Sequence, residues 1–222
     1  MRLIRSLRTL ALLALAGSLA ACAPMAKRSD YTAFRADQPR SIVVVPVVNR
    51  SVDVDAPDYF LSTIARPVAE RGYYVFPVHL TKRLMEDEGL SDADLVHNND
   101  PAVIARMFGA DAVMYVRIER WDSKYMVLQT TTTVEMDYTL KSGKDGKTLW
   151  SRHQQLAYTP NNSGGGGLAG LIGAAIAAAV EKAKPNYVPL AQQANASAVG
   201  LVGVGLPAGP YDPKFKADNA EF

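Results

Sequence analysis

The residue types that most often perform chemistry are few and scattered in this sequence. One cysteine, Cys22, and three histidines, His79, His97 and His153, occur among 222 residues. No histidine lies at metal-ligand spacing from another histidine, a cysteine or a carboxylate, and no G-x-S-x-G elbow offers a serine nucleophile. A single cysteine also excludes an internal disulfide. We therefore predict no catalytic residues, no metal site and no bound cofactor.

A glycine-rich segment imitates a dinucleotide site without completing it. Residues 165–170 read Gly-Gly-Gly-Leu-Ala-Gly, which matches G-x-G-x-x-G between an expected strand and an expected helix. A dinucleotide site also needs an acidic strand end about 20 residues further on. This chain instead has Pro185-Asn-Tyr-Val-Pro189 in that region. We interpret the segment as a flexible hinge.

The first 21 residues have the three parts of an export signal. Three arginines precede an apolar stretch from Leu10 to Gly17, and small residues follow it. The apolar stretch is far shorter than the roughly 20 residues that span a bilayer. We therefore predict a signal peptide over residues 1–21 rather than a membrane-spanning helix.

The end of this signal, Leu19-Ala20-Ala21-Cys22, resembles the bacterial lipobox. The resemblance implies cleavage between Ala21 and Cys22, with acyl chains on the thiol and on the new N-terminus. Several acyl chains hold a protein at a membrane stably, whereas one does so only reversibly. Ala23 follows, not the aspartate of an inner-membrane retention signal. We therefore expect a lipid-anchored protein of a Gram-negative outer membrane that faces the periplasm.

Composition narrows the class of protein further. The chain is 48% hydrophobic and 21% charged, close to soluble globular averages, so a polytopic membrane protein is excluded. The formal charge of +2 belongs to the precursor. Removal of the three signal arginines leaves 21 basic against 22 acidic residues, a net charge of −1. Without clustered positive charge, nucleic acid is not expected as a partner.

The mature chain divides into three parts by composition. Residues 22–40 are polar and contain two prolines, which predicts a lipidated flexible tether. Residues 41–206 carry the periodic patterns of a single folded domain. Residues 207–222 contain three prolines, and we expect this tail to lie along the surface or to fray.

The first half of the domain alternates strands and helices. Apolar strands are expected at 42–48, 73–78 and 112–118, with helices at 59–71, 80–88 and 101–108 and a short helical piece after Ser91. Pro46 has no N–H for a ladder, so the first strand should end, bulge or lie at an edge there. The order β-α-β-α-α-β favours parallel strands covered by helices.

The second half follows a different pattern. Residues 121–125 predict a turn, and from Met126 to Leu140 apolar and polar residues alternate as in an antiparallel strand with one face in solvent. Asp145-Gly146 predicts a hairpin turn before a returning strand over 148–158. The predicted fold class is therefore α/β, with a mixed sheet that ends as an antiparallel meander, followed by Ala/Gly-rich C-terminal helices.

One of these helices, predicted over 168–182, is apolar on every side. It is about 20 Å long over its apolar part, too short for a bilayer core of roughly 30 Å. Its apolar surface must therefore be buried against something, and three possibilities remain: the sheet, a partner subunit or the membrane interface. Its candidate interaction residues share one stripe and are Leu168, Leu171, Ile172, Ile176 and Val180.

Several strings are similar to one family of bacterial lipoproteins. They are RGYYVFPV at 71–78, FGADAV at 108–113, GKTLW at 146–150 and LPAGPY at 206–211. Together they resemble the GNA1162 group, also called DUF799. The resemblance implies a domain similar to the N-terminal domain of TolB and to CsgG-like secretion lipoproteins. It also implies a CsgG-like lipoprotein as partner and no enzyme activity. The one residue to which it assigns a functional role is Cys22.

From these observations we expect a non-catalytic accessory subunit of an envelope transport, secretion or surface-assembly complex. Acyl chains would bind the membrane, and a sheet edge or the Gly/Ala helix would bind a protein partner or a second copy of the chain. The rival from another class is a hydrolase of envelope polymers with a site assembled in space. A pocket holding a histidine and a carboxylate within hydrogen-bond distance would favour that rival.

Overall fold

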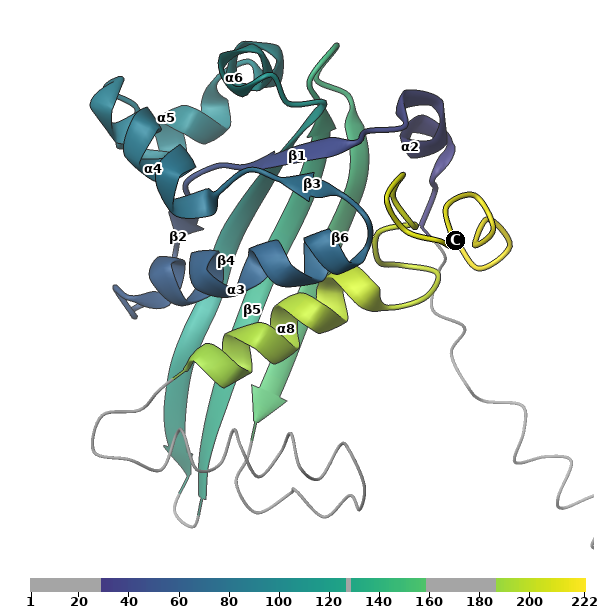
Figure 1. The fold of residues 1–222 in the computed structure, drawn as a ribbon. Helices are drawn as coiled ribbons and strands as arrows, with labels where there is room; N and C mark the ends of the chain where they lie inside the picture. Colours follow the sequence, from purple (N-terminus) through teal and green to yellow (C-terminus); the bar gives the residue numbers. More distant parts are fainter. Residues whose placement is uncertain (1–28, 127–128, 159–186) are drawn as a thin grey trace, which may run out of the picture.

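The computed structural model describes residues 29–126, 129–158 and 187–222. Within them one mixed sheet is covered by helices on both sides (Figure 1). Helices α3 (Ala56–Glu70) and α8 (Val188–Gly200) pack on one face. Helices α4 (Val78–Asp87), α5 (Ala93–Asn98) and α6 (Pro101–Phe108) pack over one end of the other face. The predicted α/β class with a mixed sheet is confirmed.

The parallel half of the sheet is built from short strands. Strand β1 (Ser41–Val44) pairs in parallel with β3 (Tyr74–Val75) and with β4 (Ala112–Met126). Strand β2 (Val48–Asn49) continues beyond Pro46 and pairs with a later part of β4. The predicted interruption at Pro46 is confirmed, since proline cannot donate to the ladder.

The antiparallel half consists of three long strands. Strand β4 pairs with β5 (Gln129–Ser142), and β5 pairs with β6 (Thr148–Tyr158), which gives the order β3-β1-β4-β5-β6. The predicted alternation is confirmed where side chains are described, because Thr132, Val134, Met136, Tyr138 and Leu140 are all buried. Gly146 adopts φ +71° in the hairpin loop, where a left-handed residue is needed.

The turn predicted at residues 121–125 is wrong. These residues extend β4, and Trp121 pairs with Val134 and is buried. A register shift between Ile118 and Arg120 inserts an extra residue, so both Ile118 and Trp121 reach the core side of the sheet. Such a bulge breaks strict alternation, and the polar residues after Trp121 then resemble a turn.

Local signals explain where the helices begin and end. The side chain of Asp92 accepts backbone N–H groups at the start of α5, and that of Asp100 does so before Pro101 at the start of α6. Gly109 ends α6 in the left-handed conformation, as predicted. No helix of the described residues is long and apolar enough to cross a membrane.

The ordered fold extends beyond residues 41–206 at both ends. Helix α2 (Thr32–Asp37) lies within the predicted tether, yet Phe34 in this helix and Tyr31 just before it are buried. In the predicted tail, Phe222 is buried and its ring meets that of Tyr31 edge-on, with centroids 5.7 Å apart. These aromatic side chains draw otherwise polar segments onto the core.

The loop after α8 is held by side chains from distant parts of the chain. Four successive carbonyl groups, of residues 204–207, each accept one hydrogen bond from them. The pairs are Trp150 Nε1 to Val204 (2.9 Å), the Tyr31 hydroxyl to Gly205 (2.7 Å), Arg71 Nε to Leu206 (2.8 Å) and the Tyr73 hydroxyl to Pro207 (2.7 Å). We call residues 204–207 the pinned loop.

Candidate functional site

Two of the sequence-predicted sites lie outside the described residues. Cys22 and the lipobox residues Leu19, Ala20 and Ala21 belong to residues 1–28. The helix stripe of Leu168, Leu171, Ile172, Ile176 and Val180 belongs to residues 159–186. Both remain predictions. Among the described residues, the antiparallel strands carry an open polar surface.

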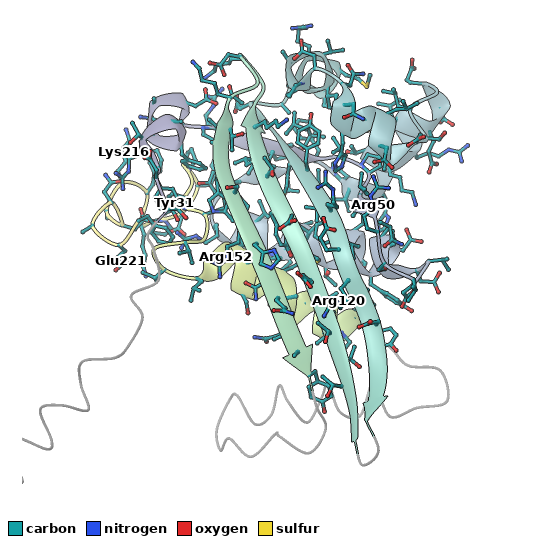
Figure 2. All side chains as sticks on the ribbon, turned by 180° about the vertical axis from the view of Figure 1, so that it is seen from behind. Tyr31, Arg50, Arg120, Arg152, Lys216 and Glu221 are labelled. Carbon is teal, nitrogen blue, oxygen red and sulfur yellow. The ribbon has the colours of Figure 1, made fainter. Side chains whose placement is uncertain are left out.

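The face of β4–β6 opposite α3 and α8 is polar beyond the area covered by α4–α6. Figure 2 looks onto this face, with Arg120 labelled on it. We call it the polar sheet face, and its members are Arg117, Arg120, Glu135, Asp137, Ser151, His153 and Gln155. It arises from strand alternation, which points residues such as Ile118, Met136 and Trp121 into the core between these positions. The exception is Glu119 at the bulge, which lies 3.7 Å from Arg117 between Oε1 and Nη1.

Cross-strand pairing arranges this face in two rows. One row runs from Arg117 through Asp137 to His153, and the next runs from Arg120 through Glu135 to Gln155. Each row therefore places a cation on β4, a carboxylate on β5 and an uncharged or titratable group on β6. The rigid ladder fixes the spacing of these charges.

His153 sits between the two carboxylates. Its Nδ1 lies 2.7 Å from Asp137 Oδ1, and its Nε2 lies 3.5 Å from Glu135 Oε1. Glu135 also faces Arg120, with 3.7 Å between Oε2 and Nε. The His153 side chain is 55% exposed, so water screens these interactions.

The polar sheet face does not offer acid–base catalysis of the kind a hydrolase needs. Because both ring nitrogens of His153 face carboxylates, neither is directed at a hydroxyl nucleophile. The pair also lies on an open surface that does not exclude water. Among the described residues, no group of three or more His, Cys, Asp or Glu side chains could hold a metal ion.

A hollow of about 250 Å³ lies elsewhere, between α2 and the C-terminal segment. Phe34, Tyr73, Pro207 and Phe215 give it apolar walls. Its lining includes one carboxylate, Asp218, which already accepts from Arg71 Nη2 at 3.0 Å and from the backbone N–H of Ala208 at 2.6 Å. No histidine lines it. It is therefore not the histidine–carboxylate pocket that would favour the hydrolase.

His97 lies at the boundary between the polar sheet face and the part of the same sheet face that α4–α6 cover. Its ring meets that of Tyr115 edge-on, with centroids 5.1 Å apart, and Nε2 lies 3.0 Å from the Pro46 carbonyl oxygen. Burial lowers the pKa of His97, and burial raises the pKa of Tyr115 to about 12. Both groups are therefore held neutral near pH 7, in contrast to the charged rows beside them.

Sequence reasoning found only part of this face. Glu135 and Asp137 fall on the solvent side of the predicted alternation, whereas His153 is, in the sequence, only one of three scattered histidines. The missing signal is the hairpin register, which brings His153 opposite Asp137. A register shift between Leu140 and Lys141 hides that pairing from a simple count across the Asp145-Gly146 turn.

Comparison with known proteins yields consistent matches. Residues 29–211 match the family described as "Putative lipoprotein GNA1162-like". The "Putative lipoprotein NMB1124/NMB1162" of Neisseria meningitidis serogroup B (strain MC58) is 36% identical over 147 residues, which are 66% of this chain and 68% of that protein. The crystal structure of lipoprotein GNA1162 from Neisseria meningitidis is 34% identical, with a TM-score of 0.55 over 62% of this chain and 95% of that chain.

A more distant likeness is to the PelC dodecamer from Paraburkholderia phytofirmans. It is 15% identical, with a TM-score of 0.44 over 72% of this chain and 84% of that chain. A score below 0.5 does not establish a shared fold, so the assembly of PelC says nothing about the assembly of this chain.

Proposed function

Because the chain belongs to the GNA1162-like lipoprotein family, we propose that acyl chains on Cys22 hold the mature protein at the outer membrane, facing the periplasm. The family predicted from the sequence strings is confirmed, and a lipoprotein is attached to a membrane by its lipid. The outer membrane is supported by Ala23, which stands where a retention aspartate would stand. Because basic residues do not cluster in the sequence, the proposal includes no nucleic-acid partner.

We further propose that the protein is a non-catalytic accessory subunit of an envelope transport, secretion or surface-assembly complex. The observation that carries this proposal is the polar sheet face, with its two rows of charge fixed by the β-ladder. A rigid surface with alternating charges selects a partner by electrostatic complementarity more than by buried apolar area. The arrangement suits docking, and it lacks the enclosed site of a hydrolase.

The partner that fits this surface is an envelope protein with the opposite order of charges. A CsgG-like lipoprotein is the first candidate, because the family resemblance implies one. A second copy of the chain is the alternative, since a face that carries both signs of charge can pair with itself when rotated.

Lipidation is tested on Cys22. Metabolic labelling with a fatty acid should mark the wild-type protein, and Cys22→Ala should lose the label and accumulate as the uncleaved precursor. Cys22→Ser tests whether the thiol itself is needed. Label that persists in both variants contradicts attachment at this residue.

Docking is tested by photo-crosslinking in intact cells. A photoreactive amino acid at Gln155 should capture an envelope protein, because this side chain is exposed on the polar sheet face. The matched control is Arg66, whose side chain is 81% exposed on α3, on the opposite side of the sheet. Adducts that are identical from both positions would place the contact elsewhere.

Charge reversal then asks whether the rows carry the contact. Arg120→Glu places a second carboxylate opposite that of Glu135 and should abolish the Gln155 adduct. Arg66→Glu, on the other side of the sheet, should leave the adduct unchanged. Adding Glu135→Arg restores an ion pair in inverted order. If the double variant regains the adduct, the ion pair matters only for local structure, and the proposal that charge order selects the partner is wrong.

A further inference from the structure

The first described residue of the chain lies beside the turn that follows α8. The backbone N–H of Ser29 donates to the carbonyl oxygen of Gly203 at 3.2 Å. In Figure 1 the purple start of the chain accordingly runs next to the loop at the end of α8. The described part of the chain therefore begins against Gly203.

This turn presents two apolar side chains to solvent. Leu201 is 50% exposed and Val202 is 58% exposed, and they are adjacent in the chain. Gly203 has φ +79°, and a Cβ on Gly205 would lie 2.3 Å from the Val199 carbonyl oxygen. The tight turn thus depends on these glycines. The pinned loop begins at Val204, directly after Gly203, and its hydrogen bonds from Trp150 and Tyr31 hold the turn rigidly in place.

The length of the tether sets how far this turn can be from the membrane. Residues 23–28 separate Cys22 from Ser29, and seven residue steps span at most about 25 Å when fully extended. If Cys22 carries acyl chains, the exposed pair is therefore confined near the lipid surface. Lys27 and Arg28 lie in the same short segment, and basic residues are attracted to anionic headgroups.

We propose that Leu201 and Val202 insert into the interfacial region of the outer membrane as a second membrane contact. This inference rests on the proposed lipidation of Cys22. Burial of two aliphatic side chains is too weak to hold the domain alone but adds to an existing anchor. Combined with the tether, the contact fixes the side of the domain that faces the bilayer. The polar sheet face would then keep one orientation toward its partners.

The test measures depth in the membrane with a single fluorophore. Because lipidation consumes the thiol of Cys22, Val202→Cys provides one reactive thiol for an environment-sensitive dye in the acylated full-length mature protein. Leu95→Cys is the matched control, since Leu95 is also apolar and is 62% exposed, on α5. Both proteins are reconstituted in vesicles of phosphatidylethanolamine and phosphatidylglycerol that contain a lipid with a quencher on its acyl chain.

We expect lipid quenching at position 202 to be severalfold stronger than at position 95. Leu201→Asp should reduce the quenching at 202 while thermal unfolding of the domain, followed by circular dichroism, stays unchanged. Equal quenching at the two positions would overturn the proposal. Shielding of position 202 from aqueous iodide without lipid quenching would also overturn it, because a protein would then cover the turn.

Mass spectrometry of the same samples separates this inference from the proposed function. Absence of acyl chains on Cys22 would refute the lipoprotein assignment at that residue, and with it the premise of the inference. Acylated protein with a water-exposed position 202 would refute the second contact alone.

Discussion

Strands β4, β5 and β6 build two faces from alternate residues of the same segments, and the two faces follow different physics. On one face, α3 and α8 cover apolar side chains from all three strands. On the other, beyond α4–α6, the rows of the polar sheet face are open in the part of the chain that the structure describes. The covered face therefore contributes to stability, whereas the polar sheet face is available for recognition.

The covered face also contains one buried polar network. The Tyr138 hydroxyl donates to Asn195 Oδ1 at 2.6 Å, and Asn195 Nδ2 donates to Thr63 Oγ1 at 2.8 Å. The network joins β5 to α8 and α3, and all three residues are nearly inaccessible to solvent. Burial raises the pKa of the Tyr138 hydroxyl, which therefore stays protonated as the donor.

The largest effect is expected from Met136→Ala on the covered face. Met136 is fully buried on the covered face. Its sequence neighbours in β5, Glu135 and Asp137, belong to the polar sheet face. Removing its side chain leaves a cavity and should lower the free energy of unfolding by about 2–5 kcal/mol. Urea denaturation measures the change. A loss no larger than that of its neighbour Glu135→Ala would refute the contrast between the faces.

A smaller loss is expected when the polar network is cut. Tyr138→Phe keeps the ring but leaves Asn195 Oδ1 without its donor, which should cost about 1–3 kcal/mol. The double variant Tyr138→Phe, Asn195→Leu removes both partners, and it should recover part of that loss if the unpaired oxygen is the cause. Additive losses would show that packing dominates instead.

A pH-dependent effect is expected at His97, where the area covered by α4–α6 meets the polar sheet face. Because burial lowers its pKa in the folded state, the unfolded chain binds more protons once the pH falls below the ordinary value of about 6.5. The free energy of unfolding should therefore fall from that pH downward and level off below the folded-state pKa. His97→Gln should lack this component, as denaturation at pH 7.5 and 5.5 can measure. Identical pH profiles would contradict it.

The smallest effect on stability is expected on the polar sheet face. Glu135→Gln removes a partly exposed charge that faces Arg120 and His153. Exposed ion pairs contribute little, so the free energy of unfolding should change by less than about 1 kcal/mol. A change as large as that of Met136→Ala would mean that this face stabilises the fold.

The residues that sequence reasoning located correctly share a local signal. Alternation from Thr132 to Leu140 marks a half-buried strand, and Asp100 with Pro101 marks a helix start, because each pattern depends on near neighbours. Trp121 misled the prediction since the bulge before it shifts the alternation by one residue.

The remaining features depend on contacts between distant segments. Nothing near Tyr31 in the sequence indicates that its ring packs on Phe222 and that its hydroxyl reaches Gly205. The same holds for the row from Arg117 to His153, which exists only once the register of two hairpins is set. Amino-acid patterns thus predict both faces of the sheet but not which charges meet on the open one.

The pinned loop has a consequence for the order in which the chain can fold. Its donors precede their acceptors by 54 to 174 residues, and closing such long loops costs entropy before any contact compensates. Tyr31 in particular cannot reach the Gly205 carbonyl until residues 204–207 have been synthesised. This late closure keeps the pinned loop open until almost the whole chain is available to fold.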